Sequence, residues 1–270
     1  MTIALIDNGS IEPAAHLNLR RVAAELAIRR GRPIEAVSWR HSDRIEPSAL
    51  NGQPAATLRS WLQAKSAEGE RDFLFVPFFI SAQGAIGSAL RHDLENSARE
   101  LGGFKFDFVA GLAERNAIVP IVVHRIRETI AKESLNRPAV IVVDHGGPSP
   151  TSATLRNELA RRIGTELGVE AAEVTAASME GEDHPHNQPL LADALRAALG
   201  SGHAVVVAPL FLSPGRHAGP GGDLAVIARE ASVSTNDPVR SPPQFHFTEL
   251  IGTHPLAVEA LAASLTAALK

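Results

Sequence analysis

The two halves of this 270-residue sequence repeat one another, which strongly constrains how the chain can fold. An apolar run ends at Asp7 near the start of the first half, and a matching run ends at Asp144 near the start of the second. The prolines that follow these aspartates, Pro13 and Pro150, have the same separation along the chain as the aspartates themselves. Two more pairs of segments match at nearly the same offset, namely 75–81 with 207–213 and 106–108 with 245–247. Offsets that vary so little indicate duplication of one folding unit that takes up half of the chain.

Both halves alternate short β-branched or apolar runs with longer amphipathic stretches. In the second half, Leu155, Leu159 and Ile163 recur at a spacing of four residues, which is typical of a helix with one apolar face. This alternation predicts an α/β protein with two tandem domains, residues 1–134 and 135–270, each a mainly parallel four-stranded sheet with helices on both faces. The expected strands lie near residues 3–7, 34–39, 73–77, 105–109, 139–143, 174–178, 203–209 and 244–248, and the expected helices near 13–29, 55–67, 85–101, 115–133, 151–167, 190–199, 222–231 and 255–269.

Composition excludes several classes of function. The net charge of −4 argues against nucleic acid as a partner, because a phosphate-binding surface normally makes a domain basic. Cysteine is absent, which excludes disulfides, thiolate metal sites, iron–sulfur clusters and cysteine nucleophiles. No apolar stretch reaches the length of a membrane span. We therefore expect a soluble, cytoplasmic protein with no membrane or nucleic-acid partner, in which any metal ion is bound by histidine and carboxylate.

Two histidines of the second half lie where predicted strands end. His145 follows the strand at 139–143 in a turn with two glycines, and His217 lies in a loop rich in glycine and proline after the strand at 203–209. Ligands of parallel α/β sheets bind outside the carboxyl ends of the strands, so both side chains are candidates for one site. Imidazole suits cobalt, iron and nickel ions, and a pair leaves coordination positions open for exchange. The alternatives are that His145 is a turn histidine without a partner and that the loop with His217 is a flexible connector.

A carboxylate and an arginine accompany this pair. Glu180 follows the second strand of the half, so its carboxylate can face the histidines, although a solvated acidic loop is an equally good interpretation. Arg216 directly precedes His217 and is either a partner for a substrate carboxylate or an exposed surface arginine. His184 and His186 are interpreted as exposed loop residues, with help in metal binding as the alternative. His254 is interpreted as a residue at a helix start, with a supporting place behind the metal site as the alternative.

These features together resemble a known family. They are the His-Gly pair at His145, the carboxylate of Glu180, and the pattern Pro-Leu-Phe-Leu-x-x-Gly-x-His from Pro209 to His217. The set is similar to that of the class II tetrapyrrole chelatases, and within them to the sirohydrochlorin chelatases of the CbiX (SirB-like) family, over most of both halves. The resemblance implies two tandem chelatase-like domains that insert a divalent metal ion into sirohydrochlorin or a related tetrapyrrole.

The resemblance also implies roles for individual residues. His145 and His217 bind the incoming metal, and Glu180 is the acidic group that assists. Glu180, or a histidine released by the metal, is expected to accept a pyrrole proton. By its position beside His217, Arg216 is a candidate partner for a carboxylate of the tetrapyrrole. Co²⁺ is the expected metal, with Fe²⁺ or Ni²⁺ as alternatives, and no nucleotide is expected because the sequence has no Walker-type glycine-rich motif. Two covalently joined halves are compatible with a monomer or a homodimer.

The first half departs from the family pattern. It has Asn8 where the second half has His145, and Ala85 where the second half has His217. We therefore expect the second half to hold the metal and the first half to complete the wall of the cleft. The alternative is a relative that binds a tetrapyrrole or a metal ion without catalysing chelation. A hydrolase using Asp144 and His145 lacks a recognisable nucleophile, and a purely structural partner of another enzyme stays open.

Overall fold

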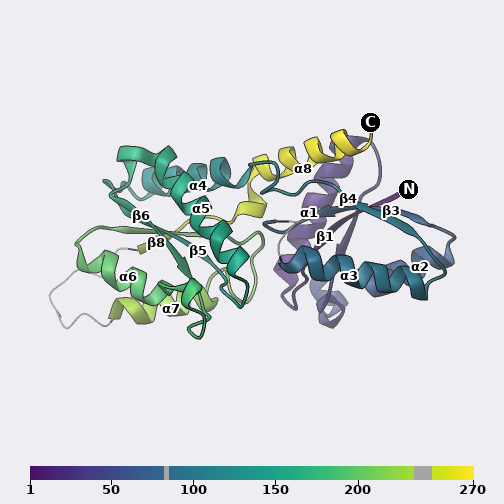
Figure 1. The fold of residues 1–270 in the computed structure, drawn as a ribbon, viewed down its shortest axis with the longest axis horizontal. Helices are drawn as coiled ribbons and strands as arrows, with labels where there is room; N and C mark the ends of the chain where they lie inside the picture. The colour runs from purple at the N-terminus through teal and green to yellow at the C-terminus, as the bar shows by residue number, and fades with distance from the viewer. Residues whose placement is uncertain (82–84, 234–244) are drawn as a thin grey trace. The chain divides into compact units, whose positions relative to one another are not determined.

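The computed structural model describes residues 1–81, 85–233 and 245–270 and contains two four-stranded parallel sheets (Figure 1). The strands are β1 Thr2–Asp7, β2 Glu35–Ser38, β3 Asp72–Pro77, β4 Lys105–Phe108, β5 Ala139–Asp144, β6 Glu173–Ser178, β7 Val205–Pro209 and β8 Phe245–Phe247. The first sheet has the order β2-β1-β3-β4 and the second the order β6-β5-β7-β8. Because corresponding strands take corresponding places, the predicted α/β fold with two repeated sheets is confirmed.

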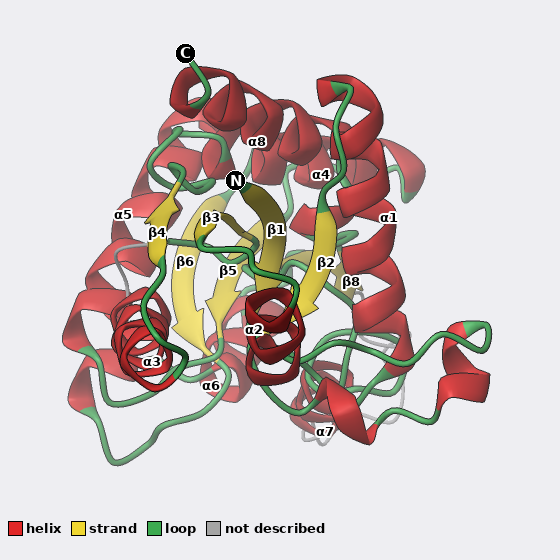
Figure 2. Cartoon of the chain, turned by 90° about the vertical axis from the view of Figure 1, so that its right-hand side faces the viewer, coloured by secondary structure: helices red, strands yellow, loops and turns green. Residues whose placement is uncertain are grey.

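Helices cover both faces of each sheet (Figures 1 and 2). They are α1 Pro13–Arg30, α2 Leu58–Ala67, α3 Ala85–Glu100, α4 Ile118–Lys132, α5 Pro150–Leu167, α6 Leu191–Gly200, α7 Asp223–Val233 and α8 Pro255–Ala268. On the first sheet, α1 packs on β1 and β2 and contacts α8, and α2 and α3 lie on the opposite face. On the second, α5 packs on β5 and β6 and contacts α4, and α6 packs beside α7.

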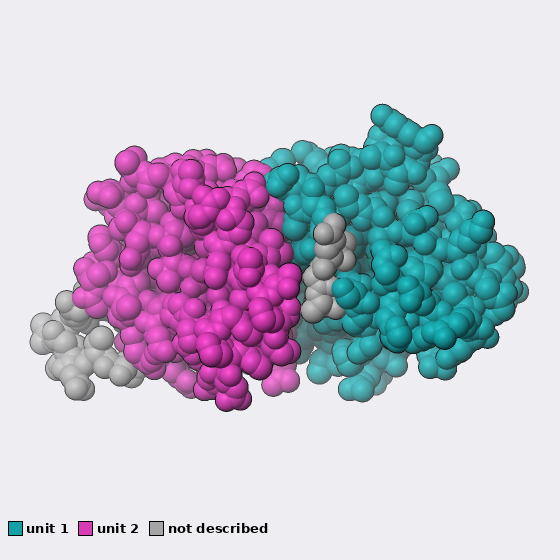
Figure 3. Space-filling view, viewed as in Figure 1, with its two compact units in different colours: residues 1–117, 212–215, 252–270 teal, residues 118–211, 216–251 magenta. Residues whose placement is uncertain are grey.

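The chain forms two compact units (Figure 3). Each unit contains the last helix of the other half of the sequence. Unit 1 comprises Met1–Ala117, Leu212–Gly215 and Gly252–Lys270, so it contains α8 from the end of the second half. Unit 2 comprises Ile118–Phe211 and Arg216–Ile251, so it contains α4 from the end of the first half. Each sheet is thus completed by a helix from the other half of the sequence, and the repeat boundary between residues 134 and 135 stays a prediction.

The central strands form because their side chains are buried on both faces. In β5 the run from Ala139 to Val143 is fully buried, as expected for a β-branched strand between two layers of helices. Its neighbours pair with it in parallel register, so Asp144 lies opposite Ser178 at the end of β6. One helix position departs from the expected apolar stripe: Arg156, and not Leu155, takes the most buried place on that turn of α5.

The predicted elements agree with the observed ones apart from shifts of a few residues at their ends. Residue 244, at the start of the predicted strand at 244–248, lies outside the described residues. Residues 82–84, in the loop before Ala85, also lie outside them. Five short 3₁₀ helices were not predicted: Ser42–Arg44, Pro47–Leu50, Gly168–Glu170, Pro185–Asn187 and Ile251–Thr253. Among the residues that the structure describes, no helix is both long and apolar enough to cross a membrane.

Candidate metal site

The candidate site lies at the carboxyl end of the second sheet, where the direction of the chain's winding changes. After β5 the chain moves to β6, and after β7 it moves in the opposite direction to β8, so the switch point lies between β5 and β7. Doubly wound α/β sheets bind ligands at this point. His145 follows β5 and His217 lies in the loop after β7, so the two histidines flank the switch point from its two sides.

Backbone contacts hold the loops after β5 and β6 together. Glu180 donates its amide hydrogen to the carbonyl of His145 over 3.1 Å. Gly146 has a φ of +85°, and a Cβ built on it would come within 2.1 Å of the carbonyl oxygen of Glu180. Glycine is therefore required here both by its conformation and by the close approach of the two loops. The contact brings the side chains of His145 and Glu180 to the same edge.

The two histidine rings predicted to bind metal lie side by side. The ring centroids of His145 and His217 are 4.7 Å apart, and the ring planes are nearly perpendicular, at 88°. Their side chains are 45% and 35% exposed, so solvent and a dissolved ion can reach both rings. All of this geometry lies within unit 2. The arrangement can hold one ion between two imidazoles while leaving other coordination positions open.

Acceptors at one nitrogen of each ring indicate which nitrogen is available to a metal. His217 Nδ1 lies 2.7 Å from a carboxylate oxygen of Asp223, and His145 Nδ1 lies 3.2 Å from the carbonyl oxygen of Gly146 and 3.5 Å from Glu180 Oε1. Carbonyl and carboxylate oxygens accept hydrogen bonds, so in the neutral rings Nδ1 carries the hydrogen. Nε2 of both rings is then the nitrogen with the free lone pair. A carboxylate behind a metal-binding histidine fixes its tautomer and orientation in the same way.

The start of α7 holds the loop that carries His217. Asp223, the first residue of this helix, donates its amide hydrogen to the carbonyl of Arg216, and Leu224 donates to the carbonyl of His217. The Asp223 carboxylate therefore contacts the His217 ring from a rigid element. Sequence analysis missed Asp223, because a spacing of six residues across an irregular loop does not predict contact. The available signal was an acidic residue opening the next predicted helix.

A buried arginine lies beneath the loops of the site. Arg156 is 1% exposed and donates hydrogen bonds to Asp144, over 3.4 Å, and to Ser178, which are the last residues of β5 and β6. It also donates to the carbonyl of His186, over 3.0 Å. Ser178 donates to the same Asp144 carboxylate over 2.7 Å. The charge of Arg156 thus neutralises a carboxylate directly before His145 and ties both strand ends together.

The remaining predicted residues are placed as follows. Arg216 is 74% exposed, and its Nε lies 3.7 Å from the Asp223 carboxylate, so it borders the site at the surface. His184 and His186 stack face to face with centroids 5.4 Å apart, and His186 Nε2 lies 2.9 Å from the carbonyl of Gly147, so these two are half-buried loop supports. The interpretation of His254 as a helix-start residue is confirmed, since its ring accepts the amide hydrogen of Leu256.

A preformed site of three or more protein ligands is not part of the structure. Among residues 1–81, 85–233 and 245–270, no three histidine, aspartate or glutamate side chains lie together in an arrangement able to hold a metal ion. Two imidazoles with an adjacent carboxylate hold an ion less completely than the four ligands of a structural metal site.

The first half has a different set of groups at the corresponding strand ends. Asp7 ends β1 with no arginine beside it, and burial raises its pKa to about 7, although hydrogen bonds from Ser38 and the Gly9 amide act in the opposite direction. His16 Nδ1 lies 3.2 Å from Ser38 Oγ, and burial, assisted by the charge of Arg20, lowers the pKa of His16 to about 4. These groups are neutral or half-charged near pH 7, unlike the paired charges beneath the second edge.

Comparison with known proteins relates the chain to one family. Residues 139–268 match the family model described as CbiX. In fold the chain is similar to "SirB from Bacillus subtilis with Fe3+", with 15% identity and a TM-score of 0.68 over 98% of this chain and 95% of that one. It is also similar to the sirohydrochlorin chelatase SirB from Bacillus subtilis subspecies spizizenii in complex with cobalt. The sequence identity is 15% and the TM-score 0.66, over 98% of this chain and 94% of that one.

A third similar structure comes from Deinococcus radiodurans. DR2241, a multi-domain protein with structural similarity to chelatases, has 17% identity and a TM-score of 0.59 over 97% of this chain and 54% of that one. At these identities the three structures establish the fold alone. No functionally curated protein matches the sequence significantly.

Proposed function

We propose that the chain, whose residues 139–268 match the CbiX family model, is a chelatase of that family and inserts a divalent metal ion into sirohydrochlorin or a closely related tetrapyrrole, without ATP. The proposal rests on one observation above all. The rings of His145 and His217 lie 4.7 Å apart on two loops that flank the switch point of one sheet. A pair of imidazoles at the surface can take an ion from solution and still leave positions for the nitrogens of a macrocycle.

Chelation exchanges two protons for one ion, since the tetrapyrrole loses two pyrrole N–H protons as M²⁺ enters. In this proposal, His145 and His217 hold the ion through Nε2 as neutral imidazoles. Asp223, 2.7 Å from Nδ1 of His217, keeps that ring in the tautomer that binds metal. Protonation of either ring removes its lone pair, so metal binding weakens as the pH falls.

Glu180 is the proposed acceptor of a pyrrole proton. Its carboxylate is 57% exposed and lies 3.5 Å from His145 Nδ1, so it touches both the metal-binding edge and solvent. A proton accepted there can leave to bulk water without crossing the protein. Arg216 is the proposed partner for a carboxylate at the rim of the tetrapyrrole, because its guanidinium is largely exposed beside the site.

The metal is the substrate of the reaction, and Co²⁺ is the ion we propose first. Fe²⁺ and Ni²⁺ are alternatives, because imidazole binds all three. The same proposal includes a cytoplasmic location and a monomer or a homodimer, with no nucleic acid, membrane or nucleotide involved.

The direct test is absorbance spectroscopy of sirohydrochlorin mixed with the protein and each ion, under anaerobic conditions for Fe²⁺. We expect the spectrum of the metallated product to appear over many turnovers per protein molecule, faster than in a protein-free control. A spectral shift that stops at one equivalent and contains no metallated product would instead support a tetrapyrrole carrier. No change beyond the control with any of the three ions would refute the proposal.

A further inference from the structure

The ends of β1 and β2 in unit 1 repeat the geometry of the candidate site. In unit 2, a Cβ on Gly146 would come within 2.1 Å of the carbonyl oxygen of Glu180. In unit 1, Gly9 has a φ of +86°, and a Cβ on it would come within 1.7 Å of the carbonyl oxygen of Arg40. Asn8, which precedes Gly9, therefore occupies the place of the first histidine of unit 2, and Arg40 occupies the place of the carboxylate.

The hydrogen bonds at the strand ends support this equivalence. Trp39 donates its amide hydrogen to the carbonyl of Asp7 over 2.9 Å, and Met179 donates to the carbonyl of Asp144 over 2.8 Å. In each unit these two residues lie at the ends of the first two strands, which pair in the same parallel register. The residue that follows Trp39 in the chain thus corresponds to the residue that follows Met179.

The substitution reverses the chemistry of the edge. A histidine and a carboxylate, which bind cations, are replaced by the amide of Asn8 and the guanidinium of Arg40, which donate hydrogen bonds. A guanidinium cannot bind a metal ion, because it is always protonated and has no free lone pair. Its planar fork of N–H groups matches the two oxygens of a carboxylate. The first edge therefore favours anions where the second favours metal cations.

Arg40 is held in place and is still accessible. Its guanidinium carbon lies 3.9 Å from the centre of the Trp39 ring, and one Nη lies 2.8 Å from a carboxylate oxygen of Asp93 on α3. Hydrogen bonds from Arg40 and Trp39 hold the pKa of Asp93 below its usual value, although burial acts against them. The Arg40 side chain remains 51% exposed, so Asp93 orients the guanidinium without enclosing it.

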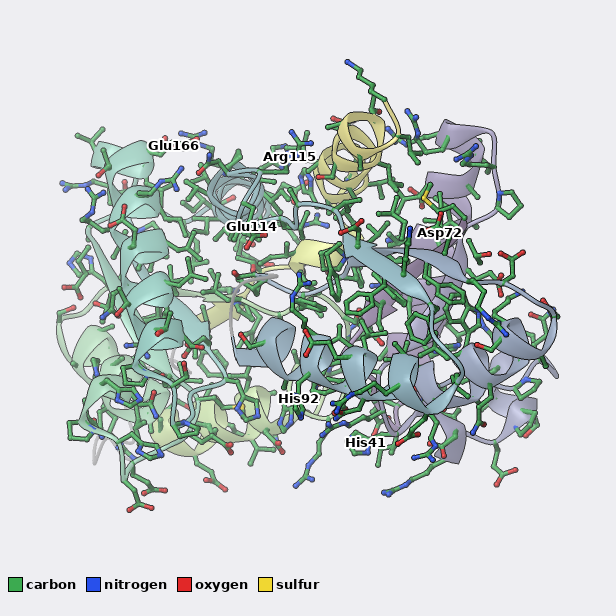
Figure 4. The ribbon with its side chains drawn as sticks, turned by 45° about the vertical axis from the view of Figure 1, so that its right-hand side comes forward. His41, Asp72, His92, Glu114, Arg115 and Glu166 are labelled. Carbon is green, nitrogen blue, oxygen red and sulfur yellow. The ribbon has the colours of Figure 1, made fainter. Side chains whose placement is uncertain are left out.

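In addition to the Asp93 carboxylate, two histidines lie near Arg40. His41 follows it with a φ of +70°, a conformation uncommon for a residue with a side chain, and His92 lies on α3 at the same end of unit 1 (Figure 4). Both side chains are exposed. Asp7 lies behind this edge and is about half protonated near pH 7, because burial raises its pKa to about 7. The edge is therefore more positive near neutral pH than the sequence alone indicates.

We propose that this edge of unit 1, centred on Arg40 and including Asn8 after the end of β1, binds carboxylate groups of the metal-free tetrapyrrole. The inference depends on the proposed function only for the identity of this ligand, which carries many carboxylates around its rim. It adds, within unit 1 alone, a second site whose chemistry differs from that of the metal site in unit 2.

The test measures binding of sirohydrochlorin without metal, in the presence of a metal chelator, by calorimetry or absorbance titration. The protein has the full chain with His217→Ala, so that no ion can be inserted during the titration. Arg40→Gln should weaken the affinity about tenfold, as expected for loss of a charge-assisted hydrogen bond, and should reduce its dependence on salt. The matched control is Arg59→Gln, which removes an arginine of the same unit that is 79% exposed.

A second variant separates binding from a structural role of Arg40. Asp93→Asn releases the guanidinium from its carboxylate and removes a negative charge, so it should raise the affinity for the tetrapyrrole. If Arg40 only stabilises the fold through Asp93, this variant will not raise the affinity. Equal affinities of Arg40→Gln and Arg59→Gln would overturn the proposal, and so would an unchanged or lower affinity of Asp93→Asn. Should Arg40→Gln fail to fold, the Asp93→Asn result decides alone.

The two proposals fail in different ways. If the wild-type protein inserts no metal but Arg40→Gln still weakens tetrapyrrole binding, the chelatase proposal fails and the carboxylate site stands. If metal insertion proceeds and the Arg40 variants bind the tetrapyrrole as the wild type does, the carboxylate site fails and the chelatase proposal stands.

Discussion

The two units share a strand order and a close contact between the loops after their first two strands, but the aspartates that end their first strands have different surroundings. In unit 2, Asp144 lies beside the buried guanidinium of Arg156. In unit 1, Asp7 takes the same place, and Leu19 stands at the position in the repeat that Arg156 holds in the second half. Without a cation, burial raises the pKa of Asp7 to about 7. Duplication has thus kept the backbone frame while the charges beneath the two edges diverged.

The divergence follows the chemistry above each aspartate. In unit 2 a fixed ion pair anchors the loops that carry His145 and Glu180, which must hold their places to bind an ion. In unit 1 the edge carries Asn8 and Arg40, and the aspartate beneath it is free to be neutral. The comparison teaches that a repeated fold need not repeat its site, and that the buried partners of the site change with it.

The largest effect should come from removing either metal-binding histidine. His145→Ala or His217→Ala should reduce cobalt insertion to the protein-free rate, because a single imidazole binds the ion more weakly and does not fix its position for transfer. Both variants should stay folded, since both residues lie in loops. Asn8→Ala, at the corresponding place in unit 1, is the matched control and should do far less damage. A loss in Asn8→Ala as large as in His145→Ala would move the metal site to the first half.

The second largest effect should be on the stability of unit 2. Asp144→Asn leaves the buried charge of Arg156 without a counter-ion and should lower the free energy of unfolding by about 3 kcal/mol. Urea unfolding followed by circular dichroism measures this change. A destabilisation well under about 1 kcal/mol would mean that the ion pair contributes little to the frame of the site.

The same substitution in unit 1 should have the opposite sign. The pKa of Asp7 is raised from 3.8 to about 7 in the folded state, so the stability that it contributes is complete below pH 3.8 and is lost as the pH rises to about 7. Asp7→Asn removes this loss, so the stability of the variant relative to the wild type should increase by about 4 kcal/mol between pH 3.8 and pH 8. Fluorescence of Trp39 and Trp61, both in unit 1, reports this unfolding transition.

In the wild-type protein, His16 and Asp7 change the stability with pH in opposite directions. The quantity to measure is therefore the difference in the free energy of unfolding between Asp7→Asn and the wild type. Burial lowers the pKa of His16 to about 4, so the stability that it contributes is present above its ordinary value of 6.5 and is lost as the pH falls toward 4. The wild-type curve therefore shows the two effects partly cancelled. A difference between Asp7→Asn and the wild type that does not change with pH would contradict the buried, proton-binding carboxyl.

The smallest effect should come from the residue that orients His217. Asp223→Asn keeps the size of the side chain but weakens the contact with Nδ1, and it should lower cobalt affinity about tenfold. Asp193→Asn is the matched control, because Asp193 also lies in the first turn of a helix but its exposed carboxylate pairs with Arg196. Equal cobalt affinities of the two variants, measured by calorimetry, would remove Asp223 from the site.

Much of the fold was predictable because it depends on local patterns. Apolar runs at a regular repeat predicted eight strands in two parallel sheets, and the ends of those strands predicted where His145, Glu180 and His217 would gather. The exchange of α4 and α8 between units was not predictable, since a helix with one apolar face can cover either of two similar sheets.

The partners of the site were not predictable for a different reason. Asp223 and Arg40 reach their places through irregular loops, where spacing along the chain does not determine which side chains meet. Arg156 lies on the buried face of an otherwise apolar helix, and a charged residue there looks like a break in the pattern until its carboxylate partner is known.

The most direct test of the central claim is X-ray absorption at the cobalt edge of the protein with one equivalent of Co²⁺. The account predicts a cobalt ion with two imidazole ligands, reduced to one in His145→Ala and in His217→Ala and unchanged in Asn8→Ala. A cobalt spectrum without imidazole ligands, or one that neither histidine variant alters, would contradict it.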